Sequence, residues 1–288
     1  MQINKVHQLT KKELLISGQS PLKPITADIT FNDNNQLKPL VIFIHGFKGF
    51  KDWGPWPIVA NKFAVEGFCF CKLNFSFNGI TPNNLSEITD LEAFGYNNFS
   101  KELDDIDRLL AHLDANNLSD QLQIDLNEVY LIGHSRGGGI SIIKTSEDSR
   151  IKKLVTWASV YDFATYFSPA ELMYWKTHGV VYVKNSRTGQ NFPMYYQFVE
   201  DFLRNEERFV IEKAISKVQQ PTLFVHGTND ETVNINAAFQ LKEWKPEAYL
   251  HVIERANHTF GGTHPFSEEK LPEDLENATD KTIEFLKE

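Results

Sequence analysis

A serine set between two glycines, directly after an apolar run, constrains this chain more than any other stretch. Residues 129–132 are Val-Tyr-Leu-Ile, and Gly133-His134-Ser135-Arg136-Gly137 follows them. A serine at a sharp strand-to-helix turn needs glycine two positions before and two positions after it, because a Cβ there would collide with neighbouring backbone. The stretch therefore predicts a strand, a tight turn that exposes the Ser135 hydroxyl, and a helix.

Composition excludes several classes of partner and location. The chain has 288 residues, of which 41% are hydrophobic and 23% charged, as in ordinary globular proteins. Its net charge of -9 argues against nucleic acid or an anionic membrane as principal partner, since both bind a basic face. No apolar run reaches the roughly 18 residues of a membrane span, and residues 1–12 lack the apolar core of a signal peptide. We therefore expect a cytoplasmic location.

The two cysteines support that expectation. Cys69 and Cys71 are two positions apart in a strand-like run, so their side chains point to one face with their Cα atoms too far apart for an unstrained disulfide. They are expected to be reduced thiols in the core, as in cytosolic proteins.

Strand-like and helix-like segments alternate along most of the chain. Two or three antiparallel strands at one sheet edge are expected over residues 3–33. Further strands are expected at 40–44, 68–75, 129–134, 153–158, 222–225 and 249–253, and helices at 55–66, 103–113, 136–147, 197–208 and 275–286. The alternation predicts an α/β fold with a mostly parallel sheet that helices cover on both faces.

One long segment interrupts this alternation. About 60 residues separate the strand ending near residue 158 from the strand starting near 221, more than a usual αβ connection. We predict a single domain over residues 1–288 with an inserted lid subdomain at 161–216, which contains a hairpin. Residues 161–202 include 12 aromatic side chains in 42 positions. These rings either build the core of the subdomain or wall a substrate slot.

A serine nucleophile needs a general base that a third group orients. Asp230 lies in the loop after an apolar strand, at the expected active edge of the sheet, and is our candidate acid, with Glu231 as the nearest alternative. His258 lies in the loop after the last strand and is our candidate base, with His264 as its rival. The order serine, acid, histidine differs from the trypsin-like and subtilisin-like orders.

Acyl transfer also needs hydrogen-bond donors for a tetrahedral oxyanion. The backbone N–H of the residue after the nucleophile, Arg136, is one candidate. The loop His45-Gly46-Phe47 after an early strand offers the N–H of Phe47 as the second. We therefore expect an oxyanion hole from Phe47 and Arg136.

Four motifs together resemble the α/β-hydrolase superfamily. They are His-Gly-Phe after an early strand, Gly-His-Ser-x-Gly-Gly at the turn, His-Gly-Thr-x-Asp after a later strand, and Asn-His before a terminal helix. Within the superfamily the chain is most similar to cinnamoyl or feruloyl esterases and dienelactone-hydrolase-like esterases, from whose patterns it departs at Asn229 and Asn257. The resemblance implies an eight-stranded core, an insertion above the site, and acyl-enzyme chemistry with no metal and no cofactor.

These features predict a serine esterase that acts on small-molecule esters with small or aromatic acyl groups. We expect Trp53, Tyr166 and Trp175 to contact the substrate. A peptidase of the prolyl-oligopeptidase type stays open, although no set of charged residues for a peptide terminus is identifiable. An inactive hydrolase fold used for binding also stays open, and the intact set of serine, acid and histidine counts against it. The oligomeric state is not predicted.

Overall fold

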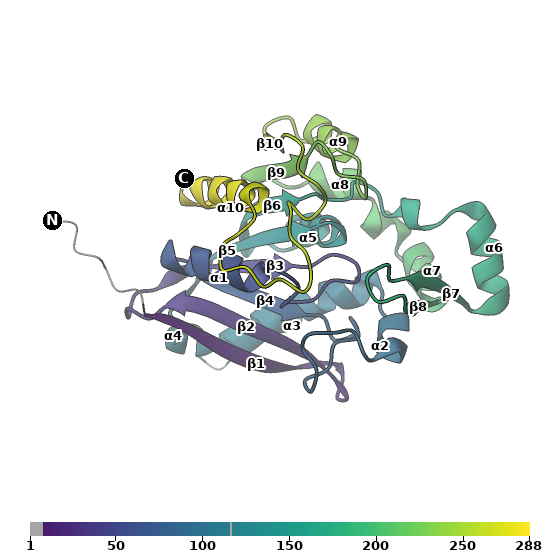
Figure 1. Cartoon of the computed structure of the whole chain (residues 1–288), viewed down its shortest axis with the longest axis horizontal. Helices are drawn as coiled ribbons and strands as arrows, with labels where there is room; N and C mark the ends of the chain where they lie inside the picture. Colours follow the sequence, from purple (N-terminus) through teal and green to yellow (C-terminus); the bar gives the residue numbers. More distant parts are fainter. Residues whose placement is uncertain (1–7, 116) are drawn as a thin grey trace.

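An eight-stranded sheet runs through the centre of the molecule (Figure 1). The computed structural model describes residues 8–115 and 117–288. The strands of the sheet are β1 (Leu9–Ser20), β2 (Lys23–Asn32), β3 (Lys38–Ile44), β4 (Cys69–Asn74), β5 (Ile124–His134), β6 (Ile151–Trp157), β9 (Thr222–Gly227) and β10 (Tyr249–Ile253). Their order is β1-β2-β4-β3-β5-β6-β9-β10. The pairs β1–β2 and β2–β4 are antiparallel and the others parallel, which confirms the predicted mostly parallel sheet.

The antiparallel strands expected at one edge are β1 and β2, which form a hairpin. Residues 3–7 of that expectation lie outside the described residues.

Helices cover both faces of the sheet (Figure 1). The helices outside the long β6–β9 connection are α1 (Trp56–Val65), α2 (Leu91–Gly95), which packs beside β8 (Asn191–Tyr195) of that connection, α3 (Phe99–Ala115), α4 (Leu118–Gln121), α5 (Arg136–Glu147), α9 (Asn236–Trp244) and α10 (Glu273–Lys287). Helices α3 and α5 pack in one hydrophobic cluster, and α1 and α10 pack in a second. Alternate residues of β3 explain the two clusters, because Leu40 and Ile42 belong to the first while Val41 and Phe43 belong to the second.

The long connection between β6 and β9 folds into elements of its own. These are η1 (Ala164–Tyr166), α6 (Pro169–His178), β7 (Val180–Lys184), β8 (Asn191–Tyr195), α7 (Gln197–Arg204), η2 (Glu206–Phe209) and α8 (Ile211–Ile215). Strands β7 and β8 form the predicted hairpin. Helix α6 and this hairpin project from the sheet in Figure 1. The rings of Phe163, Phe198 and Phe209 surround Phe99 of α3, so the insertion joins the core of the sheet.

Both cysteines lie in β4, buried and unbridged, as predicted. Among residues 8–115 and 117–288, the helices are too short or too polar to cross a bilayer.

Candidate functional site

Ser135 lies in the turn between β5 and α5, with a left-handed φ of 57° and a ψ of -122°. Such a conformation is strained for a residue with a Cβ and is common at active sites. A Cβ on Gly133 would lie 2.3 Å from the carbonyl oxygen of Gly137, and a Cβ on Gly137 would lie 2.3 Å from that of Ile44. Close backbone approach therefore requires both glycines, as the sequence pattern predicted.

Asp230 and His258 come together at the carboxyl edge of the sheet. Asp230 follows β9 and is 5% exposed. Its Oδ2 lies 2.8 Å from Nδ1 of His258, which donates the hydrogen bond. Its Oδ1 accepts backbone N–H bonds from Thr232 at 2.9 Å and Val233 at 2.8 Å. The carboxylate is therefore fixed by backbone on one side and holds the histidine ring on the other.

A second histidine also faces this carboxylate, and the sequence did not predict the contact. Nε2 of His226 lies 3.3 Å from Oδ2 of Asp230 and donates to the carbonyl oxygen of Val233 at 2.8 Å. Burial by itself would raise the pKa of Asp230, but the bonds from His226 and His258 outweigh burial and hold that pKa well below its ordinary value. The group is therefore a carboxylate at neutral pH.

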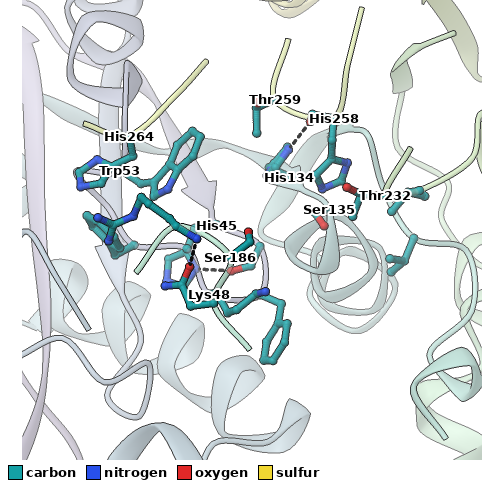
Figure 2. A pocket seen from close by; sticks show the side chains of 18 of the residues that line it. His45, Lys48, Trp53, His134, Ser135, Ser186, Thr232, His258, Thr259 and His264 are labelled. Carbon is teal, nitrogen blue, oxygen red and sulfur yellow. Dashed lines mark hydrogen bonds between the residues drawn. The ribbon is translucent and has the colours of Figure 1, made fainter. Parts of the chain in front are cut away.

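The alternative acid and base lie elsewhere. Glu231 is exposed. The ring of His264 stacks on Trp53 with centroids 6.0 Å apart, and its Nδ1 accepts the N–H of Gly54 at 3.0 Å. Figure 2 shows His264 and Trp53 on the opposite side of the cavity from His258 and Ser135.

Ser135 and His258 open into one cavity of about 1020 Å³ (Figure 2). Trp53 and Tyr166 line it. Trp175 does not belong to the lining. It is 3% exposed and packs against Phe167 and Phe198 inside the insertion, where a large ring fills the small core. We therefore remove Trp175 from the candidate substrate contacts.

The loop after β3 lies directly against the nucleophile. A Cβ on Gly46 would be 2.8 Å from Cβ of Ser135, so only glycine allows this approach. The approach brings Phe47 close to the start of α5. The guanidinium of Arg136, the residue after the serine, lies 4.7 Å from the centroid of the Phe47 ring. The same guanidinium pairs with Glu102 of α3, and both side chains are buried.

Two further histidines, His45 and His134, are neutral and hold these loops through hydrogen bonds to backbone carbonyl groups. Burial lowers the pKa of His45 to about 4 and that of His134 to about 3. Nε2 of His134 donates to the carbonyl oxygen of His258 at 2.9 Å, and Nδ1 of His45 donates to that of Gly46 at the same distance. Each ring therefore holds the backbone of a loop that reaches the cavity.

Proton transfer and nucleophilic attack both use side chains of the types that this site brings together, a serine, a histidine and a carboxylate. Among the residues that the structure describes, no three His, Cys, Asp or Glu side chains are grouped to hold a metal ion.

Two family models match the chain. The alpha/beta hydrolase fold model matches residues 39–175, and the prolyl oligopeptidase family model matches residues 109–273, more than half of the chain. The chain belongs to the prolyl oligopeptidase family of α/β hydrolases. No similar sequence is found among curated proteins.

Solved structures of other α/β hydrolases share the fold of this one. Est1E from Butyrivibrio proteoclasticus, solved with ferulic acid bound, has a TM-score of 0.68 and 20% identity over 95% of this chain and 97% of that chain. A putative dienelactone hydrolase from Klebsiella pneumoniae has a TM-score of 0.60 and 14% identity over 97% of this chain and 99% of that chain. The predicted likeness to esterase-like and dienelactone-hydrolase-like α/β hydrolases is confirmed.

Proposed function

We propose that this α/β hydrolase cleaves carboxylic esters through an acyl-enzyme. The observation that carries the proposal is the 2.8 Å bond between His258 and buried Asp230 in the cavity that also holds Ser135. In the proposed mechanism, Nε2 of His258 takes the hydroxyl proton as Oγ of Ser135 attacks the ester carbonyl carbon. Asp230 holds the ring in the required tautomer and stabilises the imidazolium.

After the attack, His258 acts as an acid to complete acylation and then again as a base for deacylation. When the tetrahedral intermediate collapses, His258 gives its proton to the leaving alkoxide, and the acyl group stays on Ser135 as an ester. His258 then deprotonates a water molecule that attacks the acyl carbon, and the acid leaves as the serine regains its proton. We propose the backbone N–H groups of Phe47 and Arg136 as donors to both oxyanions, supported by the packing of Gly46 on Ser135.

We further propose that the substrates are small molecules with small or aromatic acyl groups. A cavity of about 1020 Å³ lies at the upper end of the usual size for small-molecule sites. Trp53 and Tyr166 are among the aromatic side chains of its walls, and Phe192, like Tyr166, comes from the insertion. We propose residues 161–216 as a fixed lid over this cavity, held on the sheet by the rings that surround Phe99. The expected preference is a higher kcat/KM for cinnamoyl and butyryl esters than for long-chain lipid esters.

A peptidase is the second candidate, and the match to the prolyl oligopeptidase family favours it. Purified protein assayed with p-nitrophenyl esters, cinnamoyl esters and aminoacyl anilides separates the two candidates. Ester hydrolysis without cleavage of any anilide supports the esterase. A kcat/KM for an aminoacyl anilide that exceeds those for the esters would replace the esterase with the peptidase.

The nucleophile and base are tested by Ser135→Ala, His258→Ala and the double variant. Each single change should abolish ester hydrolysis and leave the fold intact, and the double variant should be little worse, because such residues act as a unit. Near-additive losses of kcat would contradict the assignment. A fluorophosphonate probe should label wild-type Ser135 and leave Ser135→Ala unlabelled. Folded wild-type protein that hydrolyses no substrate and takes up no probe would leave the inactive binding fold as the better explanation.

A further inference from the structure

Cationic residues from two distant segments line the cavity. Lys48 follows Phe47 in the loop after β3, and its Nζ lies 3.5 Å from the carbonyl oxygen of Lys184 at the end of β7. The hairpin turn that continues from Lys184 contributes Ser186 and Arg187 to the cavity lining. Figure 2 shows Lys48 and Ser186 together, across the cavity from His258.

Two carboxylates, Glu87 and Asp162, line the cavity together with Lys48 and Arg187, but Lys48 pairs with neither of them. Lys48 has no carboxylate within ion-pair distance in residues 8–115 and 117–288. Arg187 has Glu87 at 3.6 Å from Nη1 to Oε1, which is a long ion pair. The other lining acid, Asp162, accepts the N–H of Ala164 at 2.8 Å. One cation therefore faces the cavity unpaired in a protein whose net charge is -9.

The structure also holds Lys48 in place. Its backbone has a left-handed φ of 59°, and the loop closes through the N–H of Gly49, which donates to the carbonyl of Gly46 at 3.0 Å. The ammonium lies 5.7 Å from the centroid of the Phe47 ring, which covers part of the side chain. Burial lowers the pKa of Lys48. A partly desolvated ammonium attracts an anion more strongly than one in water.

We infer that Lys48 and Arg187 form an anion subsite, and that the preferred ester carries a carboxylate close to its scissile bond. The inference rests on the proposed ester hydrolysis at Ser135. Lys48 and Arg187 line the same cavity as Ser135, so a carboxylate bound by these two residues would occupy the cavity together with the reacting carbonyl. A guanidinium and an ammonium both donate charge-assisted hydrogen bonds to carboxylate oxygens, and Arg187 also keeps its long pair with Glu87.

Two pairs of chromogenic or ultraviolet-detected esters test the subsite on each side of the scissile bond. The acyl-side pair is mono-p-nitrophenyl glutarate and p-nitrophenyl pentanoate, and the alcohol-side pair is 4-acetoxybenzoate and 4-acetoxybenzamide. The measured quantity is the ratio of kcat/KM for the anionic ester to that for its neutral partner, after subtraction of spontaneous hydrolysis. We expect a ratio above one in one of the pairs, and a lower ratio when NaCl is added.

Substitution of Lys48 should change this ratio of kcat/KM values. If Lys48 had only a structural role, the ratio would stay the same. Lys48→Met should lower it about tenfold, the size expected when one hydrogen bond to a charged group is lost. Lys48→Glu should invert it in favour of the neutral ester, and Arg187→Gln should lower it in the same direction as Lys48→Met. Lys152→Met is the control, because it removes the charge of an exposed lysine at the amino end of β6, whereas the cavity lies at the carboxyl ends of the strands. This variant should leave the ratio unchanged.

Binding to the Ser135→Ala variant separates this inference from the proposed function. Calorimetric titration should show the anionic ester binding more tightly than its neutral partner, with the difference lost in Ser135→Ala/Lys48→Glu. Equal affinities and equal wild-type kcat/KM values in both pairs would overturn the anion subsite, even if every ester were hydrolysed. Preferential binding of the anion without hydrolysis of any ester by the wild type would instead overturn the proposed function and keep the subsite.

Discussion

At the scale of single residues, the Asp230 carboxylate has donors on both of its oxygens. Thr232 and Val233 hold Oδ1, while the two histidine rings lie on the side of Oδ2. Asp230→Asn keeps the shape of this arrangement but removes the negative charge and allows the wrong tautomer of His258. We expect kcat to fall by about 10⁴-fold, the loss seen for the equivalent change in the trypsin triad. Stopped assays with p-nitrophenyl butyrate measure it.

Glu231→Gln is the matched control, because it makes the same chemical change one residue later on an exposed side chain. Its kcat should stay close to that of the wild type. If Glu231→Gln were the damaging change and Asp230→Asn the mild one, the acid would be Glu231.

The buried pair of Arg136 and Glu102 leads to a second prediction at this scale. The guanidinium of Arg136 contacts both Glu102 and the ring of Phe47. It therefore connects Arg136 and Phe47, the two residues whose N–H groups are the candidate oxyanion donors. Glu102→Gln leaves the guanidinium buried without its counter-charge. We expect the free energy of unfolding to fall by about 3 kcal/mol, and kcat to fall while KM changes little, because a displaced donor weakens only the transition state.

The affinity for a boronic acid that mimics the tetrahedral intermediate should fall in parallel with kcat. Glu207→Gln is the control, since Glu207 pairs with Lys213 on the surface and its side chain is 85% exposed. An unchanged boronic-acid affinity in folded Glu102→Gln protein would limit the role of the pair to stability.

The residues of the candidate triad were predictable because each stands in a short motif at the end of an apolar strand. The side chains that contact those motifs from distant parts of the chain were not predictable. Glu102 and Arg136 are 34 positions apart, and they meet only when α3 packs beside α5. One signal was available, since Glu102 shares a helix face with Phe99 and Ile106 and a charge on an apolar face indicates a buried partner.

At the scale of elements, the turn between β5 and α5 depends on the absence of a side chain at Gly137. A Cβ there would meet the carbonyl oxygens of Ile44 and His45, at 2.3 and 2.6 Å, and both belong to backbone that cannot rotate away. Gly137→Ala should therefore lower the free energy of unfolding by about 3 kcal/mol or more, as for an overpacked core. Urea unfolding followed by circular dichroism measures it.

Gly67→Ala gives the comparison for backbone strain alone. Gly67 has a φ of 95° and no atom within 4 Å of its built Cβ, so only the unfavourable φ should count, at about 1 kcal/mol. Equal losses in the two variants would mean that the turn relaxes and that Gly137 is not required for close approach.

The elements that the sequence predicted are those with a strong apolar pattern. The core strands were expected close to their observed positions, because strands such as β3, β4 and β9, which are buried on both faces, are nearly continuous apolar runs. Helices α2, α4, α6, α8 and α9 were not expected, and α2 lies in a stretch predicted as a polar loop. The two longest of these are α6 and α9. Among its described residues α6 buries Trp175, and α9 buries two alanines and one leucine, so neither helix has a regular stripe of large apolar side chains.

At the scale of the whole molecule, the insertion and the sheet share one hydrophobic cluster. Phe163, Phe198 and Phe209 contact Phe99 of α3, and Trp175 and Phe192 belong to the same cluster. The sequence alone did not decide whether the many aromatic side chains of the insertion pack its core or wall a substrate slot. The rings named here pack the core, and Phe192 also lines the cavity. An insertion built in this way cannot open as one rigid lid without exposing the core.

Hydrogen exchange tests this coupling directly. Amides of α7, which carries Phe198, should exchange with nearly the same opening free energy as those of α3, because both unfold when the shared cluster opens. Amides of α6 should exchange faster, since most of that helix is exposed.

Replacing residues 165–212 with a short Gly/Ser linker should remove partners of Phe99 and give a protein with a broad, low-temperature unfolding transition. Fast exchange throughout α7 together with a sharp, native-like transition in the deletion variant would show instead that the insertion folds separately and can move as a lid.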